Sequence, residues 1–177
     1  MDLGTGEAGH KILTQATIRQ FAMRLERIGS LELVYTDVDE EWPFPDGGQV
    51  YGILTGKLEA GSLRGTIHAT NLARQRPDGG FTPALRGVLS TPEGVKLFFT
   101  MDGISVKDAT ATPPRRTVTT GITLWSADPR FRSWNDTYLV AETVGRAIGK
   151  SWGVSGDLYR CVSELYIRPP SSAKGDC

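Results

Sequence analysis

The densest group of polar side chains in the chain lies between Asn71 and Gly80, and Arg86 follows it closely. Arginine presents five N–H donors in a planar fork that matches a carboxylate or an oxyanion. Arg76 and Arg86 are therefore candidates for binding an anionic ligand and stabilising an anionic transition state. Asp78 is a candidate base, but burial would have to raise its pKa against the neighbouring arginines. The alternative is a solvated turn, which the Pro-Asp-Gly run within this segment favours.

A second group of candidate residues extends from Trp125 to Asn135. Trp125 and Trp134 could form an apolar wall for a flat ligand, with Asn135 supplying a hydrogen bond. In the alternative interpretation, Asp128 and Arg130 hold the loop in place while Trp134 closes the end of the fold. The residue types are compatible with either role.

Alternation along the expected strands predicts which side chains face an interior. In the strand after the turn at Gly94, one face is apolar and is expected to point inward: Val95, Leu97, Phe99 and Met101. The same rule places five polar residues on inward faces: Tyr51, His68, Arg86, Tyr138 and Glu142.

Two of these five residues are further candidates for proton transfer. Glu142 has Tyr138 and apolar residues nearby, which could desolvate its carboxyl enough for acid–base chemistry near neutral pH. His68 carries an imidazole, whose unperturbed pKa is near neutrality. Tyr51 and Tyr138 are candidates for ligand binding. The alternative is that His68 is structural or solvent-facing and that Glu142 lies in water.

No pattern in the sequence requires a metal ion or an organic cofactor, so none is expected. The two histidines, His10 and His68, have no carboxylate or thiol at ligand spacing. The glycine-rich N-terminal segment has the spacing of a dinucleotide-binding loop, but no strand precedes it. Cys161 lies in an expected strand and is interpreted as a small buried hydrophobe.

Length and charge restrict the class of protein. A chain of 177 residues fits one domain with a single core. Its 20 basic residues balance its 20 acidic ones, so the attraction that nucleic-acid binders and membrane-surface proteins use is absent. The sequence contains neither a long apolar span nor a secretory signal. We expect a cytoplasmic protein with neither nucleic acid nor a membrane as partner.

An amphipathic helix is expected over residues 11–28. Its apolar residues follow helical spacing: Ile18, Phe21, Ala22, Leu25 and Ile28. Gly29 comes next, as glycine often does just past a helix. The helix offers a surface through which the chain could form a homo-oligomer or dock a partner.

After Gly29 the pattern changes to short β-forming runs separated by turn residues. Eight strands are expected, over residues 31–38, 49–58, 62–70, 81–90, 94–103, 116–125, 136–143 and 157–167. The segments 59–61 and 91–94 are tight-turn signals, so the runs that they join should form antiparallel hairpins.

These elements predict an all-β fold: a closed antiparallel barrel of about eight strands, calycin-like, behind the N-terminal helix. Closure would remove the exposed strand edges that invite aggregation. The predicted organisation is an N-terminal segment and helix over residues 1–29, a barrel over 30–168 and a disordered tail over 169–177.

Several motifs, in their order and spacing, resemble one uncharacterised family. They are the run 65–71, the turns 76–79 and 91–94, and Asp128-Pro129-Arg130-Phe131 leading to Asn135. Together they resemble the domain of unknown function 3237 over about residues 30–167. The resemblance implies a small closed barrel. Because members accompany biosynthetic or catabolic genes, it also implies cofactor-free conversion of small molecules.

One position departs from that family's pattern, which usually reads Asp-x-Arg-Tyr-x-Trp-Leu-Asn. This chain has Phe131 and then Ser133 and Trp134 before Asn135, so the tryptophan has moved by one position. In an extended segment such a shift reverses the side that a residue faces. The ligand is therefore expected to differ in shape from that of typical members.

Three functional hypotheses follow. The first is a cofactor-independent isomerase, cyclase or lyase that acts on a small, partly apolar metabolite, with proton transfer by Asp78, Glu142 or His68. The second is a non-catalytic barrel that binds or carries a ligand. The third is a structural subunit that docks a partner through the N-terminal helix.

The first two hypotheses both require a lined cavity, and the sequence does not separate them. The candidate residues concentrate in the turn at 71–80, the strand at 81–90 and the loop at 126–135. We expect any site to lie where these three segments meet.

Overall fold

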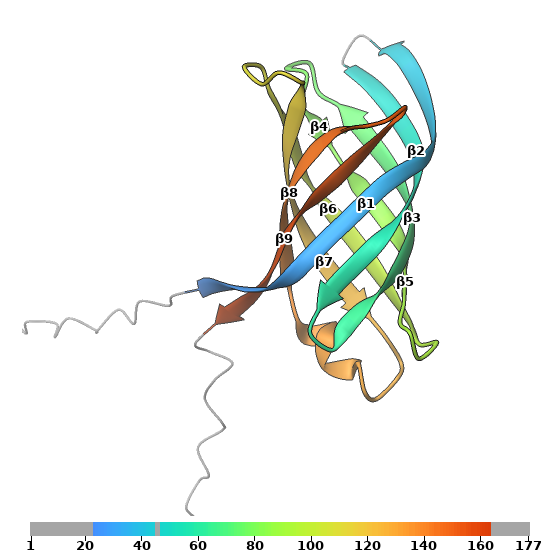
Figure 1. Ribbon diagram of the computed structural model, residues 1–177, viewed down its shortest axis with the longest axis vertical. Coiled ribbons are helices and arrows are strands. Elements are labelled where there is room, and N and C mark those ends of the chain that lie inside the picture. The colour runs from blue at the N-terminus through green and yellow to red at the C-terminus, as the bar shows by residue number, and fades with distance from the viewer. Residues whose placement is uncertain (1–22, 45–46, 164–177) are drawn as a thin grey trace, which may run out of the picture.

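The computed structural model describes residues 23–44 and 47–163 (Figure 1). Nine antiparallel strands run through this part of the chain: β1 (Met23–Phe44), β2 (Gly47–Ala60), β3 (Leu63–Gln75), β4 (Phe81–Thr82), β5 (Ala84–Ser90), β6 (Lys96–Asp108), β7 (Arg115–Trp125), β8 (Leu139–Ile148) and β9 (Ser151–Ser163). A short 3-10 helix, η1 (Arg132–Asp136), lies between β7 and β8. Within the described residues, no helix has the length and apolar character needed to cross a membrane.

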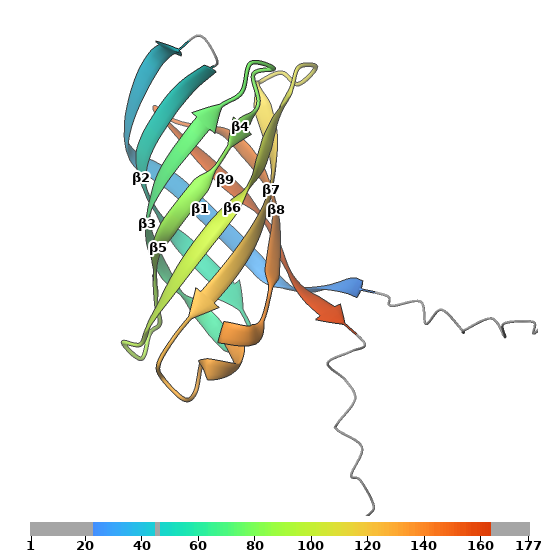
Figure 2. The same ribbon diagram turned by 180° about the vertical axis from the view of Figure 1, so that it is seen from behind.

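The strands form one sheet that returns to its first strand. β1 pairs with β2 on one side and with β9 on the other, and the sheet continues from β9 through β8, β7 and β6. β6 pairs with β5, β5 with β3 and β3 with β2, which completes a ring (Figures 1 and 2). The short β4 bridges β3 and β6. The predicted all-β antiparallel architecture is confirmed, with nine strands in a ring-like sheet.

Two-residue periodicity determines which side chains point into the ring. In β7, Val118, Ile122 and Leu124 are buried, whereas Thr119 and Thr123 between them are exposed. The predicted inward face at the start of β6 is confirmed by the packing of its four apolar residues: Val95, Leu97, Phe99 and Met101.

Both predicted hairpins are present. Gly61 connects β2 to β3 with a φ of +61°, and Gly94 connects β5 to β6 with a φ of +81°. Glycine adopts this left-handed region without a steric penalty, which explains its place in each turn.

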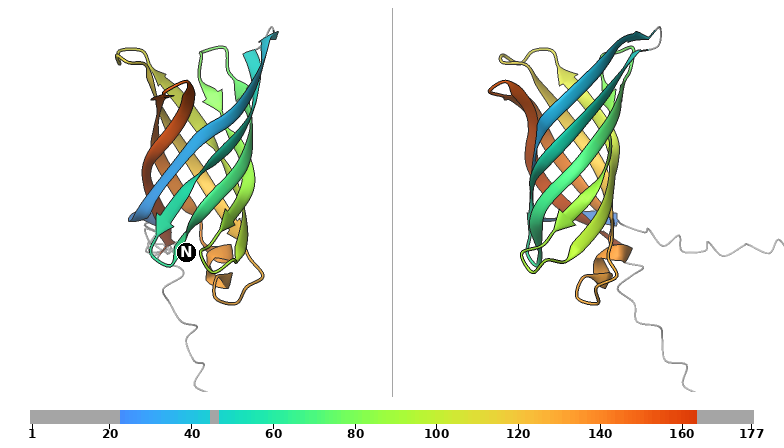
Figure 3. Two further views of the ribbon diagram at one scale, coloured as in Figure 1. Left: turned by 45° about the vertical axis from the view of Figure 1, so that its right-hand side comes forward. Right: turned by 90° about the vertical axis from the view of Figure 1, so that its right-hand side faces the viewer.

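The hydrophobic core fills the end of the ring that carries η1. Its largest fully buried apolar side chains are leucines: Leu31, Leu33, Leu63, Leu89, Leu97, Leu139 and Leu158. The turns at Gly61 and Gly94 lie at this end, as does the loop that contains η1 (Figure 3). Phe131, at the start of η1, is 7% exposed and joins the same core.

The predicted helix over residues 11–28 is not supported. Residues 11–22 lie outside the described part of the chain, and residues 23–28 form the start of β1. Backbone pairing with β9 stabilises this segment as a strand, which outweighs the helical spacing of its apolar residues. Gly29 lies inside the strand, where an added Cβ would meet the Glu59 carbonyl oxygen at 1.8 Å.

The first described strand overlaps the segment that was predicted to precede the barrel. The sheet starts at Met23, before the expected barrel boundary at residue 30. The predicted tail over residues 169–177 lies outside the described residues.

Candidate functional site

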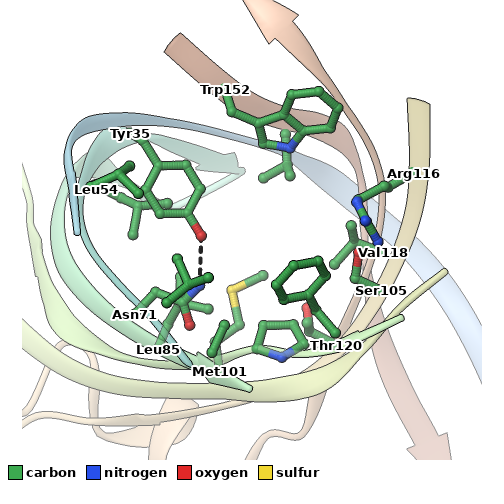
Figure 4. A pocket seen from close by; sticks show the side chains of 16 residues that line it. Tyr35, Leu54, Asn71, Leu85, Met101, Ser105, Arg116, Val118, Thr120 and Trp152 are labelled. Atoms are coloured by element: carbon green, nitrogen blue, oxygen red, sulfur yellow. Dashed lines mark hydrogen bonds between the residues drawn. The ribbon is translucent and has the colours of Figure 1, made fainter. Parts of the chain in front are cut away.

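The ring holds a pocket of about 310 Å³ toward the end opposite η1 (Figure 4). Every strand except β8 contributes to its walls. Most of the lining is apolar: Val38, Val50, Leu54, Ala73, Phe81, Pro83, Leu85, Met101, Val118, Trp152 and Val154. Five polar side chains complete it: Tyr35, Asn71, Ser105, Arg116 and Thr120. Among the described residues, no group of His, Cys, Asp or Glu is arranged to hold a metal ion.

Tyr35 and Asn71 form a fixed pair on one wall. The backbone N–H of Ala84 donates to Asn71 Oδ1 at 2.9 Å, which directs Asn71 Nδ2 toward Tyr35 Oη at 2.6 Å. Because Tyr35 Oη already accepts this bond, its own proton is left to donate to another group. Burial raises the pKa of Tyr35, so the phenol stays protonated at neutral pH. The pair therefore offers a ligand one neutral hydrogen-bond donor.

Two hydroxyl groups lie across the pocket from Tyr35 (Figure 4). Ser105 is 5% exposed and Thr120 is 1% exposed. Thr120 Oγ1 has no hydrogen-bond partner among the described residues. A buried polar group without a partner costs about 1–3 kcal/mol, so a ligand that bonds to Thr120 would recover free energy.

Arg116 brings a positive charge to the same wall. Its Cζ lies 4.5 Å from the centroid of the Phe81 ring, and its Nη1 donates to the Gly79 carbonyl oxygen at 3.1 Å. No described carboxylate forms an ion pair with it. Partial burial lowers the pKa of Arg116, yet an arginine stays protonated in proteins. The side chain is a half-buried cation that faces the pocket.

The predicted site in the turn at 71–80 lies at the rim of the pocket. Arg76 and Asp78 form an ion pair with each other, and Asp78 Oδ1 also accepts the Gly80 N–H at 2.9 Å. The hydrogen bond from Arg76 holds the pKa of Asp78 below its ordinary value. A general base near neutral pH needs the opposite shift, and neither side chain lines the pocket.

The residues predicted to face inward lie on the outer surface instead: Tyr51, His68, Arg86, Tyr138 and Glu142. The inward positions beside them carry small or polar residues, such as Gly52, Ala141 and Thr143, so the alternation of apolar and polar residues is weak there. Arg86 pairs on the outside with Asp102 at 2.8 Å.

The loop after β7 is held by its own polar residues. Arg130 Nε and Nη2 lie 3.0 and 2.8 Å from the two oxygens of Asp128, and this contact lowers the pKa of Asp128 to about 2. Asn135 Oδ1 accepts a hydrogen bond from the Ser126 backbone N–H at 2.8 Å, and Asn135 Nδ2 donates one to the Ser126 carbonyl oxygen at 3.0 Å. Trp134 packs against the core. These contacts close the core end of the ring.

The three segments expected to form one site do not meet. The loop at 126–135 and the turn at 71–80 lie at opposite ends of the ring (Figure 3). Trp125 points outward with 56% exposure, and its ring centroid lies 6.1 Å from that of Phe98. It does not line the pocket.

The polar residues of the pocket do not form a cluster in the sequence, so the density of polar residues does not reveal them. Arg116 and Thr120 share a face of β7 with the buried Val118. Alternation from Val118 would have placed both of them inside the ring. Asn71 follows the buried Ala69 by two positions in β3, but its neighbours suggested a turn.

The fold resembles solved structures, whereas no family model and no curated protein matches the chain. A β-barrel-like protein from Acinetobacter baumannii AYE is 18% identical, with a TM-score of 0.68 over 80% of this chain and 97% of that one. A protein of unknown function from Clostridium acetobutylicum is 13% identical, with a TM-score of 0.67 over 80% and 100%. An enzyme from Penicillium herquei is 12% identical, with a TM-score of 0.60 over 79% and 95%. The likeness shows a β-barrel-like fold.

Proposed function

We propose that this protein is a calycin-like barrel that binds a small, mostly apolar organic molecule inside the ring. The observation that carries the proposal is the pocket of about 310 Å³, with its largely apolar wall and a few converging polar groups. Binding sites for small molecules have this composition and begin at about this volume. Membership of the domain of unknown function 3237 family, which rests on the motifs quoted above, is part of the proposal.

The pocket is not filled by the protein's own core, and this supports binding rather than a purely structural role. The core members Leu54 and Met101 turn one side toward this open volume, and Val50 lines it beside them. Moving apolar ligand surface out of water onto such a wall contributes roughly 25 cal/mol per Å². A ligand of matching shape would therefore bind without a metal or a covalent bond.

A fluorescence titration with N-phenylnaphthylamine tests the proposal, because this uncharged probe brightens when it leaves water. We expect saturable binding at one site in the wild-type protein. Ala73→Phe fills the pocket and should abolish the signal. Leu72→Phe, one residue along on the outer face at a position 56% exposed, should leave it unchanged.

Circular dichroism and the melting temperature show whether both variants are folded, and Val50→Phe provides a second way to fill the same pocket. Binding that survives in folded Ala73→Phe and Val50→Phe would place the probe elsewhere. A wild-type protein that shows no saturable binding would also contradict the proposal.

A cofactor-independent isomerase, cyclase or lyase is the second candidate. The observation that favours it is the Tyr35 donor facing the Arg116 cation across an apolar space (Figure 4). Such a pair could stabilise an enolate or phenolate as it forms. The acid–base residues expected from the sequence, Asp78, Glu142 and His68, do not line the pocket. Catalysis would therefore depend on stabilising the anion, while solvent water or hydroxide takes the proton.

Exchange of the acidic carbon-bound protons of tetralone in heavy water tests this second candidate. If the protein stabilises an enolate, wild type should accelerate the loss of these proton signals in NMR spectra. Tyr35→Phe should remove the acceleration, and Tyr51→Phe on the outer face should retain it. If wild type binds tetralone but does not accelerate the exchange of its protons, the result would favour the carrier function.

A further inference from the structure

We propose that the ligand of this pocket is an organic acid whose anionic group, a carboxylate or a phenolate, binds Arg116. The inference rests on the proposed function and names the chemical class of its ligand. It concerns one residue that the sequence did not single out.

Arg116 differs from the other arginines near this end of the ring. Arg76 is paired with Asp78, and Arg115 Nε lies 2.8 Å from Asp108 Oδ2. Arg116 lines the pocket, is half-buried and has no carboxylate partner among the described residues. Holding a guanidinium partly out of water is unfavourable until an anion compensates its charge.

The guanidinium of Arg116 is positioned before any ligand arrives. The Phe81 ring lies under it at 4.5 Å, and the Gly79 carbonyl oxygen accepts one of its N–H groups at 3.1 Å. An arginine has five N–H donors, so four remain for other acceptors. A planar fork held in this way suits a carboxylate, which can accept two parallel hydrogen bonds.

A second observation independently points to a polar ligand group on the same wall. Thr120 Oγ1 is buried, has no hydrogen-bond partner among the described residues and lines the pocket four residues along β7 from Arg116. Ser105, on the neighbouring strand β6, adds another buried hydroxyl. These hydroxyls and Arg116 form a polar strip in a wall that is otherwise apolar.

The remaining lining defines the rest of the molecule. Val50, Leu54 and Leu85 fit a hydrocarbon or aromatic body, and Tyr35 offers one donor on the facing wall. A compact, largely apolar acid with a single anionic group matches this arrangement. A strongly polar metabolite does not, because its other groups would be desolvated without partners.

Competition between an acid and its ester tests the inference, with N-phenylnaphthylamine as the bound reporter. Naphthoic acid and methyl naphthoate share an aromatic body and differ in charge. At neutral pH the acid should displace the reporter from wild type at a concentration about tenfold lower than the ester, since bonds to charged groups are the stronger ones. Arg116→Gln should remove this preference, so that the acid and the ester displace the reporter at similar concentrations.

Arg115→Gln is the matched control, because its side chain is the next along β7 and is paired with Asp108 on the outside. It should keep the preference for the acid. The inference is overturned if wild type binds the reporter and the ester but shows no preference for the acid, or if the preference survives in Arg116→Gln. If wild type binds neither the reporter nor either competitor, the proposed function itself fails.

Discussion

At the residue scale, Thr120 shows how a buried polar atom can mark a binding wall. Thr120 is 1% exposed and its hydroxyl lacks a partner in the described part of the chain, although buried polar groups in folded proteins are nearly always hydrogen-bonded. Thr143 on β8 is equally buried, but its Oγ1 donates to the Val118 carbonyl oxygen at 3.3 Å. The two threonines therefore differ in whether another group of the protein forms a hydrogen bond with the side-chain hydroxyl.

Replacing these two threonines by valine should therefore have opposite effects on stability. Thr120→Val removes an unsatisfied hydroxyl and should raise the free energy of unfolding by about 1 kcal/mol. Thr143→Val removes a hydrogen bond and should lower it by about 1 kcal/mol. Urea unfolding of both variants measures the difference. A loss of stability in Thr120→Val would show that its hydroxyl is already satisfied in the free protein.

At the scale of the elements, the strands and turns were largely predictable. The glycine turns at Gly61 and Gly94 and the alternation between them specify two hairpins from local chemistry alone. The segment before Gly29 was not predictable in the same way. Its apolar spacing fits a helix, and its strand state depends on β9, which lies more than a hundred residues later. The residues near Gly29 in the sequence contain no signal that predicts the pairing of β1 with β9.

Because the segment around Gly29 is a strand packed beside β2, a substitution of Gly29 by alanine should have a predictable effect on stability. An added Cβ would lie 1.8 Å from the Glu59 carbonyl oxygen of β2, so Gly29→Ala should lower the free energy of unfolding by about 2 kcal/mol or more. Gly121→Ala is the control, because its Cβ would meet the hydroxyl end of Tyr138, which can rotate away. Thermal unfolding compares the two. An Ala at position 29 with wild-type stability would contradict the pairing described for β1.

The loop after β7 makes a prediction about pH. The pKa of Asp128 falls from an ordinary 3.8 to about 2, first because Arg130 donates a hydrogen bond to it. The stability that it contributes is therefore present above pH about 4 and is lost as the pH falls through about 2. Asp128→Asn should be less stable than wild type at pH 7, and the difference should shrink toward pH 2. Asp136→Asn, an exposed aspartate in η1, is the control.

Unfolding free energies measured in urea across this pH range test the prediction. A gap between wild type and Asp128→Asn that stays constant from pH 7 to pH 2 would contradict the role of the Asp128 ion pair. Asp108 has a similarly lowered pKa of about 2, so the Asp128→Asn variant should still lose part of its stability in acid.

The candidate site was less predictable than the strands, for a physical reason. Clusters of charged residues such as those around Asp78 and Asp128 form in turns, where their charges pair with each other in water. Polar residues inside the ring stand singly among apolar ones, as Asn71 and Arg116 do. A dense run of polar residues in the sequence therefore indicates a surface turn. The residues that line the pocket are instead indicated by their alternation along a strand.

At the scale of the whole molecule, the loop at 126–135 and the turn at 71–80 beside the pocket lie at opposite ends of the ring. The hydrophobic core links the two ends, because its members Leu54, Leu85 and Met101 also line the pocket. Pairing with β9 from Met23 to Val34 closes the ring through β1, whereas the rest of β1 toward Phe44 pairs with β2 alone. The strands around the pocket hold single polar groups such as Tyr35 and Arg116 in its wall.

The methyl group of Met101 provides the most direct test of the account. The chain has three methionines. Met101 lines the pocket at 2% exposure, whereas Met23 is 72% exposed outside it. In protein labelled with carbon-13 at the methionine methyl groups, naphthoic acid should shift the Met101 signal, assigned with Met101→Leu, and leave the Met23 signal in place. A Met101 signal that does not move at saturating ligand would contradict binding inside the ring.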